Sequence, residues 1–252
     1  MTYEAEKELF ERLCAAESYR VQGVSAESGI GIYNEKRLHR ILKNTFCENE
    51  DCFEVKVGRY VADVLVRDTI FEIQCASFSP LRKKLEYYLS QTEYNVCVVC
   101  PMIAKKTVIR AERETGEIAR MRVSAKKDNE LNAIAKLYPI RHLLLDERLT
   151  VKIMLIEAEE YRYSEAVRYR RTGKYDAELF PIALVGSVEL CSIEDYKRFL
   201  PEELYGSEFS AADFAKLTKL KSRDAYSALN TLSELGILTR EKQGRAVRYS
   251  VN

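Results

Sequence analysis

The most regular pattern along the chain is an alternation of apolar and polar side chains between residues 61 and 74, which read VADVLVRDTIFEIQ. A period of two is typical of half-buried β-strands. The dipeptide at 67–68 interrupts the alternation, and a loop of two residues there predicts a β-hairpin. In that hairpin Asp63 and Glu72 lie opposite one another on one face. Gln74 joins them, because it lies two positions further along its strand.

Apolar side chains at helical spacing predict a helix on each side of this hairpin. Residues 31–46 form an amphipathic segment with Leu38, Ile41 and Leu42 on its apolar face. Residues 80–92 read PLRKKLEYYLSQT, with proline near the first turn, where helices accept it. The remaining pattern predicts a buried strand at 95–100, a charged hairpin at 105–127, a helix at 130–145 that Pro139 interrupts, a strand at 149–163, an apolar strand or short helix at 180–190, and a helix at 192–200 capped by Ser192.

Length and composition are typical of a soluble protein with two domains. The chain has 252 residues, more than the usual size of one domain, and contains no apolar run long enough to cross a membrane. Its first residues, MTYEAEKELFERL, are acidic where a signal peptide would be basic, so we expect a cytoplasmic protein. Seven cysteines at irregular spacing indicate reduced thiols rather than a disulfide framework.

The residues expected on one face of the hairpin have the chemistry of a divalent-metal site. Asp63 and Glu72 supply two carboxylates, and Gln74 supplies an amide oxygen. Neighbouring carboxylates repel one another unless a hard cation lies between them, and oxygen ligands suit magnesium. We therefore expect Mg²⁺ or Mn²⁺ at these residues. The alternative is a hairpin that carries a salt-bridged Asp and Glu at its edge.

The order of elements around this hairpin resembles the PD-(D/E)xK nuclease superfamily, over roughly residues 30 to 101. The core of that superfamily is a helix, a three-stranded meander, a helix and a strand, and its signature is an aspartate followed by (D/E)xK on the next strand. The resemblance implies that Asp63 and Glu72 hold the metal together with the carbonyl of Ile73. It further implies hydrolysis of phosphodiester bonds. Glu35 matches the acidic residue that archaeal Holliday-junction resolvases carry in the preceding helix.

Two positions differ from the signature of the superfamily. Ala62 stands where the signature has proline, and Gln74 stands where it has lysine. The resemblance implies that Gln74 orients the attacking water, which a neutral amide does only in part. In some members of the superfamily a basic side chain reaches the site from the next helix. Lys83 and Lys84 are the candidates for that role, with Arg82 as a further one.

Two serines follow the signature, just before the second helix. Ser77 and Ser79 are expected to bond a phosphate oxygen near the start of this helix, and capping of the helix is the plainer role for Ser79. A degenerate nuclease fold that binds nucleic acid without cleaving it is the competing interpretation of the whole segment, and Gln74 is the feature that favours it.

Positive charge is concentrated in two later segments, although the net charge is only +1. Residues 105–127 are strongly basic, which predicts either a nucleic-acid surface or simply a solvated hairpin. Residues 161–176 read YRYSEAVRYRRTGKYD and interleave tyrosines with basic side chains. Such a mixture can contact phosphates and stack on bases, with Arg170 and Arg171 as candidates. An exposed hairpin whose tyrosines pack on its own strands is the alternative.

The C-terminal residues 208–251 resemble a winged helix-turn-helix. Ser210 is the expected cap of a first helix and Ser222 of a second, and a two-stranded wing is expected to turn at 243–244. Ala225, Ala228, Leu229, Leu232 and Leu235 form the inward stripe of the second helix. The residues expected to contact DNA are Lys221, Ser222, Arg223 and Tyr226 at the start of that helix and Lys242, Arg245 and Arg248 on the wing. Winged domains also bind proteins, in which case these side chains form a solvated face.

These observations predict an α/β protein with a restriction-endonuclease-like core, a central mixed sheet flanked by helices, and a small C-terminal winged-helix domain. The expected domains are residues 1–156, a basic connector at 157–204, and residues 205–252. The expected function is Mg²⁺-dependent or Mn²⁺-dependent DNA cleavage targeted by the winged helix. Expected partners are duplex or branched DNA, with a homodimer as an open possibility and no membrane. The alternatives are a non-catalytic nucleic-acid-binding regulator or adaptor, and an effector whose nuclease core a partner or small ligand switches.

Overall fold

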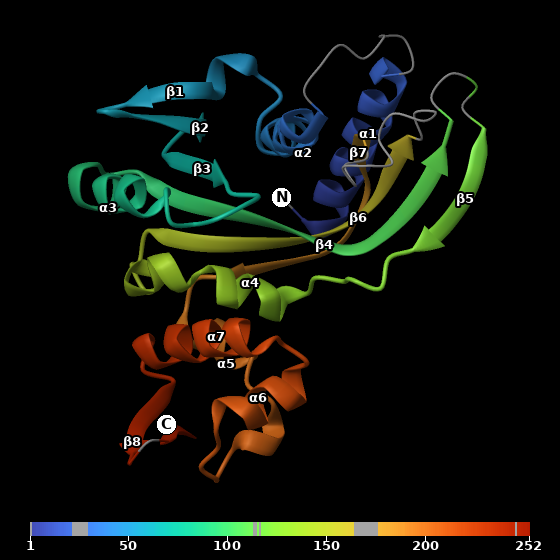
Figure 1. The fold of residues 1–252 in the computed structure, drawn as a ribbon. Coiled ribbons are helices and arrows are strands. Elements are labelled where there is room, and N and C mark those ends of the chain that lie inside the picture. Colours follow the sequence, from blue (N-terminus) through green and yellow to red (C-terminus); the bar gives the residue numbers. More distant parts are fainter. Residues whose placement is uncertain (1, 22–29, 113–114, 116, 164–175, 245) are drawn as a thin grey trace. The chain divides into compact units, whose positions relative to one another are not determined.

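The main feature of the fold is a seven-stranded mixed sheet. The computed structural model describes residues 2–21, 30–112, 115, 117–163, 176–244 and 246–252. Strands follow the order β1-β2-β3-β4-β6-β7, and β5 pairs with β4 (Figure 1). Their bounds are β1 (Phe53–Val57), β2 (Tyr60–Val66), β3 (Thr69–Ile73), β4 (Asn95–Ala111), β5 (Ile118–Val123), β6 (Leu149–Tyr163) and β7 (Asp176–Leu190). The predicted α/β class, with a mixed sheet and flanking helices, is confirmed.

Helices occur before, between and after these strands. They are α1 (Tyr3–Val21), α2 (Ile30–Phe46), α3 (Arg82–Gln91), α4 (Glu130–Lys136), α5 (Ile193–Lys197), α6 (Ala211–Thr218) and α7 (Ser222–Glu234), with 3-10 turns η1 (Glu50–Cys52), η2 (Tyr138–Leu143) and η3 (Glu202–Leu204). The helix predicted at 130–145 is split into α4 and η2, because Pro139 lacks the N–H that a continuous helix needs. No helix within the described residues has both the length and the apolar character needed to cross a membrane.

The described chain divides into two compact units, each built from separated segments. The first unit comprises Met1–Phe53, Pro101–Asp128 and Met154–Ser187, and the second comprises Glu54–Cys100, Asn129–Ile153 and Val188–Asn252. The long strands β4, β6 and β7 contribute residues to both. The three consecutive segments expected from the sequence, 1–156, 157–204 and 205–252, stay a prediction.

In the first unit, α1 and α2 pack against one another and are tied to β7. The Tyr3 hydroxyl donates a hydrogen bond to the carbonyl of Leu184 (3.3 Å). Arg37 of α2 donates to the carbonyl of Leu179 (3.0 Å), and its guanidinium lies 4.0 Å from the ring centroid of Phe180. The apolar face predicted for α2 is confirmed by the burial of Leu38, Ile41 and Leu42.

In the second unit, β2 and β3 form the predicted hairpin. Val66 pairs with Thr69, so two residues make the turn, and Arg67 there has a positive φ of 55°. After β3 the chain forms α3 and returns as β4, which runs parallel to β3 with Thr69 opposite Asn95. A helical crossover of this kind is the usual connection between parallel neighbouring strands. Leu85, Tyr88 and Leu89 form the buried face of α3.

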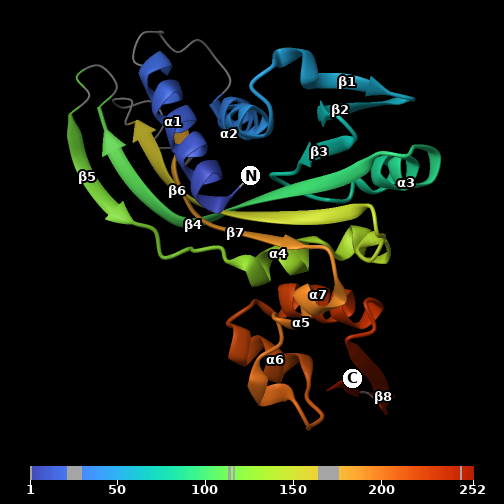
Figure 2. The same ribbon diagram turned by 180° about the vertical axis from the view of Figure 1, so that it is seen from behind.

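The end of the chain forms two helices followed by a hairpin. In the second unit α7 packs against α4 and α6, and Figure 2 shows α7 beside α4. Ser210 caps α6 as predicted, through a reciprocal arrangement with Asp213. The inward stripe predicted for α7 is confirmed by the burial of Ala225, Ala228, Leu229, Leu232 and Leu235.

Two details of this C-terminal region differ from expectation. Ser222 does not cap α7. It is the first residue of the helix, and the extended residue before it, Lys221, makes no side-chain capping bond. The hairpin consists of β8 (Leu238–Gln243) and β9 (Ala246–Val251), and Gln243 pairs with Ala246. The two-residue turn therefore begins at Gly244, whose φ of 64° suits glycine, and not at 243.

Candidate active site

Asp63 and Glu72 lie on neighbouring strands of the β2–β3 hairpin. Val64 pairs with Phe71, so the next position along each strand places Asp63 opposite Glu72. The Oδ2 atom of Asp63 accepts a hydrogen bond of 2.7 Å from the backbone N–H of Ile73. Asp63 is half-buried, whereas Glu72 is only 3 % exposed. The hairpin thus brings together the two carboxylates that the sequence predicts.

Lys84 reaches the carboxylate pair from α3. Its Nζ lies 2.6 Å from Oε2 of Glu72, and the Lys84 side chain is 18 % exposed. A buried carboxylate needs such a partner, because transfer of an unpaired charge from water into the interior is costly. Lys83, the other candidate from this helix, is exposed. The structure therefore selects Lys84 as the basic side chain at the pair.

The surroundings of Glu72 disfavour the charged form of its carboxylate. Burial, followed by the negative charge of Asp63, raises the pKa of Glu72 to about 7, although Lys84 opposes this shift. Its second oxygen, Oε1, is buried and has no hydrogen-bond partner among the described residues. Tyr88 is also affected, because burial and the negative charge of Glu72 raise the pKa of its hydroxyl.

These residues fit a small divalent cation. An oxygen of Glu72 that is buried without a partner, next to a second carboxylate, offers the hard ligands that Mg²⁺ and Mn²⁺ prefer. Within the described part of the chain, no three Asp, Glu, His or Cys side chains are grouped closely enough to bind a metal. The metal site would therefore use Asp63 and Glu72, and the carbonyl of Ile73 stays a prediction as a third ligand. Glu35 belongs to α2, and its side chain lies outside the described structure.

The polar residues directly after the carboxylate pair form hydrogen bonds with one another. The amide Nε2 of Gln74 donates to the carbonyl of Ser77 (2.8 Å), and the Ser77 hydroxyl oxygen accepts from the N–H of Ser79 (3.3 Å). Ser79 does not cap α3. The helix begins at Arg82 and is preceded by Leu81, which makes no side-chain capping bond. The predicted contacts of Ser77 and Ser79 with phosphate stay predictions.

An aromatic cluster beside Glu72 was not predicted from the sequence. The ring of Tyr60 lies 5.4 Å from that of Tyr87 and 6.1 Å from that of Tyr88. Arg59 lies over the Tyr60 ring at 5.2 Å and over the Tyr87 ring at 5.0 Å. A signal for Tyr88 was present, because it follows Lys84 by four residues and so shares its face of the helix.

The basic residues predicted for DNA contact are placed unequally. Lys221, Ser222 and Arg223 are exposed at the start of α7, Tyr226 is 52 % exposed one turn later, and Lys242 is exposed on β8. Arg248 is half-buried on β9, where it lies opposite Glu241 in the strand register. The predicted Arg170, Arg171 and Arg245 lie outside the described residues.

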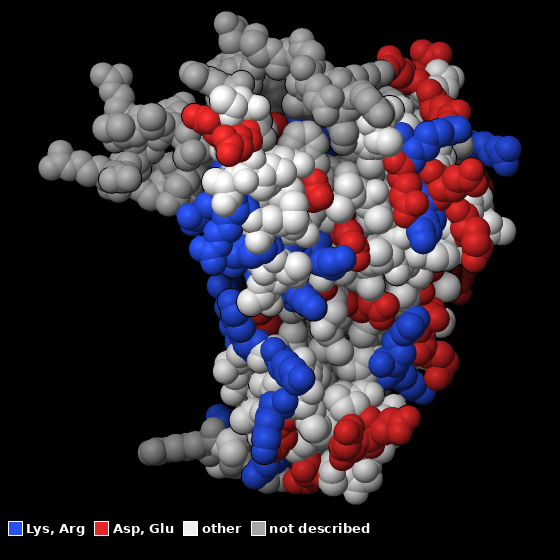
Figure 3. Space-filling view, turned by 90° about the vertical axis from the view of Figure 1, so that its right-hand side faces the viewer, with Lys and Arg blue, Asp and Glu red and all other residues white. Residues whose placement is uncertain are grey.

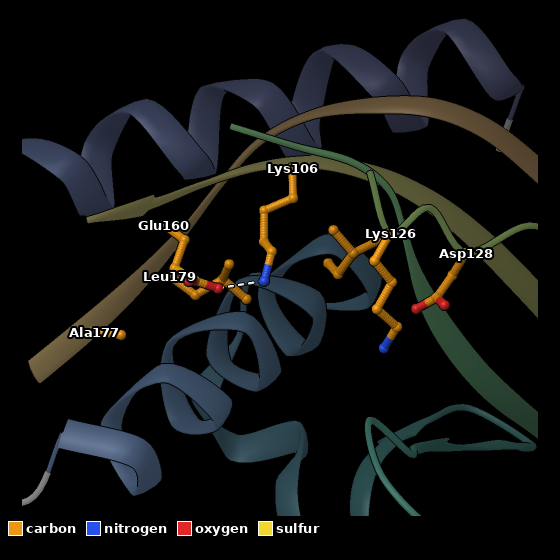
Figure 4. Close-up of a pocket in the computed structure, with 7 residues that line it drawn as sticks. Lys106, Lys126, Asp128, Glu160, Ala177 and Leu179 are labelled. Atoms are coloured by element: carbon orange, nitrogen blue, oxygen red, sulfur yellow. Dashed lines mark hydrogen bonds and ion pairs between the residues drawn. The ribbon is translucent and has the colours of Figure 1, made fainter. Parts of the chain in front are cut away.

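A cavity of about 270 Å³ lies in the first unit (Figure 4). The charged residues of its lining are Lys106, Lys126, Asp128 and Glu160. Glu160 forms ion pairs with Lys106 and with Arg162, whose Nε is 2.5 Å from Oε1. Burial raises the pKa of Glu160, but the hydrogen bonds from Lys106 and Arg162 outweigh burial and lower it. None of the carboxylate-pair residues lines this cavity.

The raised pKa of Glu72 predicts that the protein loses stability as pH rises. The folded state holds the Glu72 proton up to a pKa of about 7, whereas the unfolded chain releases it near the ordinary value of 4.5. The contribution is therefore complete below pH 4.5 and is lost as pH rises through 7, up to about 3 kcal/mol. Glu72→Gln should remove this dependence. Urea unfolding in EDTA at pH 5 and pH 8 measures the change in unfolding free energy between the two pH values. An equal change in the wild type and in Glu72→Gln would show that Glu72 is not the source of the pH dependence.

The chain is similar to a known protein family over more than half of its length. The model of the family described as domain of unknown function (DUF8091) matches residues 36–190, a segment that includes Asp63, Glu72 and Lys84. No curated protein and no solved structure matches the chain. The matched segment covers most of the 252 residues, and the chain therefore belongs to the DUF8091 family.

Proposed function

We propose that the protein is a metal-dependent nuclease that hydrolyses phosphodiester bonds of DNA. The observation that carries this proposal is the buried carboxylate of Glu72, which has one oxygen without a partner and lies next to Asp63 and Lys84. A carboxylate with a raised pKa, a second carboxylate and a lysine in one place are typical of a catalytic site rather than of a structural hairpin.

Each of these residues has a defined part in phosphodiester hydrolysis. Asp63 and Glu72 hold Mg²⁺ or Mn²⁺, which when bound lowers the pKa of an attacking water and offsets negative charge on the phosphate. Glu72 must be deprotonated for this, so cation binding strengthens as pH rises through about 7. Lys84 supplies positive charge to the phosphate oxygens, and Gln74 helps to orient the water.

The order of elements supports the resemblance to PD-(D/E)xK nucleases. Helix α2 is followed by the β1-β2-β3 meander, then by α3 and by β4, which is parallel to β3. This order agrees with the superfamily core. Lys84 on α3 lies where members with a displaced lysine supply it, which compensates for Gln74 in the signature position.

The C-terminal elements support targeting to DNA by a winged helix. Two helices, α6 and α7, precede the β8–β9 hairpin in the order that this module requires. Lys221, Arg223 and Lys242 are exposed, and none of them forms an ion pair with a described residue. Unbalanced basic side chains at the start of the second helix and on the wing suit contacts with phosphates.

Replacement of these three basic residues should weaken DNA binding in a salt-dependent way. In Lys221→Ala/Arg223→Ala/Lys242→Ala, three released counterions fewer should flatten the slope of log affinity against log salt by about 2 to 3. Fluorescence anisotropy with a duplex in EDTA measures the slope. Lys197→Ala is the control, because Lys197 already forms an ion pair with Glu194 and is not among the residues expected to contact DNA, and it should change the slope by less than about 0.5. An unchanged slope in the triple variant would assign α7 and the hairpin to protein contact.

The nuclease proposal is tested by a comparison of substrates and metals. Purified protein is incubated with supercoiled plasmid, linear duplex, branched DNA, single strands and RNA, each with Mg²⁺, Mn²⁺ or EDTA. We expect cleavage of at least one DNA substrate that depends on the cation and is absent in Asp63→Asn. Cleavage by both proteins at equal rates would contradict the assignment of the metal site to Asp63, and absence of cleavage of every substrate would favour the second candidate.

A non-catalytic nucleic-acid-binding protein is the second candidate. The observation that favours it is the neutralisation of the carboxylate pair without any metal, because Lys84 bonds one oxygen of Glu72 and the Ile73 N–H bonds one oxygen of Asp63. This candidate predicts binding to DNA without cleavage under every metal condition. It also predicts that Mg²⁺ leaves the melting temperature of the wild type and of Glu72→Gln equally unchanged.

A further inference from the structure

The β4–β5 hairpin places arginine side chains next to one another on one face of the sheet. Arg110 on β4 is opposite Arg120 on β5, and Val108 is opposite Arg122. Residues two apart on a strand share a face, so all three guanidinium groups project from the same side. Like charges directly opposite one another destabilise a strand pair. The hairpin thus gathers three guanidinium groups on one face, where a negatively charged ligand can contact them together.

Several basic side chains of this hairpin are also not balanced by carboxylates. Arg120, Arg122, Lys126 and Lys127 are exposed, and none of the four forms an ion pair with a residue that the structure describes. Residues 105–127 contain eight Lys and Arg but three Asp and Glu, although the whole chain carries a net charge of only +1. Figure 3, viewed from the β5 side, shows Lys and Arg gathered toward one side of this face, whereas blue and red alternate on the other side.

Strand β5 is accessible to an extended ligand. All of its residues from Ile118 to Val123 are exposed, and within the described chain it pairs with β4 alone. Arg120 and Arg122 are two positions apart on the strand, about 7 Å along the chain. Two guanidinium groups at this spacing can contact successive charged groups of one polymer, and guanidinium suits phosphate because it bonds two oxygens at once.

The cavity of the first unit adds basic groups beside the hairpin. Lys106 lies two residues before Val108 on β4, hence on the same face as Arg110, and projects into the cavity toward Glu160 (Figure 4). Lys126, which follows β5, also lines the cavity and is exposed. Glu160 forms an ion pair with Lys106, whereas Lys126 forms none with a described residue. Lys126 therefore extends the basic side chains of the two strands to the edge of the cavity, where Asp128 also lies.

We propose that the face of the β4–β5 hairpin formed by Arg110, Arg120, Arg122 and Lys126 binds the phosphodiester backbone of a nucleic acid. The choice of nucleic acid as the polyanion rests on the proposed nuclease function. The surface belongs to the first unit and is separate in sequence from both the carboxylate pair and the C-terminal winged helix. It contacts phosphates and therefore contributes affinity without reading base sequence.

A second copy of the chain fits this surface less well. Met121 and Val123 are 57 % and 54 % exposed, and an open strand edge with apolar side chains can pair with another strand. In a symmetric pair of β5 strands, however, Arg120 and Arg122 of each copy would approach those of the other, and like charges oppose such pairing. The same arginines that disfavour a second copy favour a polyanion.

The test measures binding in EDTA, where no cleavage occurs. Fluorescence anisotropy with a duplex DNA, a single-stranded DNA and an RNA of equal length compares the wild type with Arg120→Gln/Arg122→Gln/Lys126→Gln. We expect the slope of log affinity against log salt to flatten by about 2 to 3 in the variant, with affinity on the order of 100-fold weaker near physiological salt. The melting temperature should be unchanged, since the three replaced side chains are exposed and form no ion pair with a described residue.

A charge-matched control is Arg12→Gln/Lys105→Gln/Lys197→Gln. Arg12 and Lys105 are exposed and Lys197 is half-buried, and the three are already paired with Glu48, Glu157 and Glu194. The inference is overturned if the control weakens binding as much as the hairpin variant does, or if the hairpin variant binds every nucleic acid as the wild type does. It is also overturned if Met121→Ser/Val123→Ser converts a wild-type dimer to a monomer while the hairpin variant keeps full affinity. Weakened binding by the hairpin variant supports the binding surface even when the wild type cleaves no DNA with Mg²⁺. Normal binding by a hairpin variant of a protein that does cleave DNA contradicts the binding surface and leaves the nuclease proposal intact.

Discussion

Glu72→Gln and Asp63→Asn should each lower the rate of divalent-ion-dependent DNA cleavage by at least about three orders of magnitude. Each change keeps the shape of the side chain and removes one of the two negative charges that would hold the cation. Glu72 contributes the oxygen that is buried without a partner, and Asp63 is fixed by the N–H of Ile73. When one of these two charges is removed, the hairpin no longer compensates a divalent cation for the hydration that it loses on binding.

The measurement is a single-turnover cleavage rate on the best DNA substrate at saturating Mg²⁺ or Mn²⁺. Lys83→Ala is the matched control, because Lys83 is exposed on the same helix whose neighbouring residue, Lys84, reaches Glu72. It should retain the wild-type rate within about threefold. Full activity of Glu72→Gln would show that the carboxylate pair is not the metal site.

Stability separates loss of chemistry from loss of fold. Without metal, Glu72→Gln removes a buried charge whose pKa is raised, so the variant should unfold at the same or a higher temperature at pH 8. With Mg²⁺, the wild type should gain stability by mass action and the variant should not. If Glu72→Gln is inactive and also melts well below the wild type, its loss of activity can result from loss of fold. Asp63→Asn then tests whether the carboxylate pair is needed for cleavage.

The hairpin and its carboxylates were predictable because strand geometry has a period of two. Alternation between 61 and 74 and a two-residue turn determine which residues are opposite, so Asp63 and Glu72 followed directly from the sequence. The buried stripe of α7 was predictable for the corresponding helical reason. In each case the signal comes from a repeating pattern within one element.

The choice between Lys83 and Lys84 could not be made with the same certainty. It depends on how α3 is rotated against the hairpin, which packing of Leu85, Tyr88 and Leu89 determines. The first residues of α3 and α7 were not predictable either, although the Ser210 cap of α6 was. Ser79 and Ser222 have the chemistry of caps, but whether a serine caps depends on the backbone angles at one residue, and these are set by the neighbouring turns.

Lys84→Ala should lower the cleavage rate on the order of 100-fold or more, the second largest effect we expect. The ammonium group lies 2.6 Å from Glu72 and supplies the positive charge that Gln74 cannot. The effect has a second signature. Lys84 opposes the upward shift in the pKa of Glu72, so its removal should raise that pKa further and move the rising limb of the pH–rate profile to higher pH.

Lys84→Arg and Lys84→Ala/Gln74→Lys test whether Lys84 acts as the displaced lysine of the signature. Arginine keeps the positive charge and should retain more activity than alanine. Lysine at position 74 lies two residues beyond Glu72, where the signature has it, and should recover at least tenfold of the lost rate if charge at the phosphate is the requirement. For this, the lysine side chain must point toward Glu72 and not toward the carbonyl of Ser77, to which Gln74 now donates a hydrogen bond. A Lys84→Ala enzyme with the wild-type rate and pH profile would show that Lys84 only neutralises Glu72 in the folded protein, and would favour the non-catalytic alternative for this side chain.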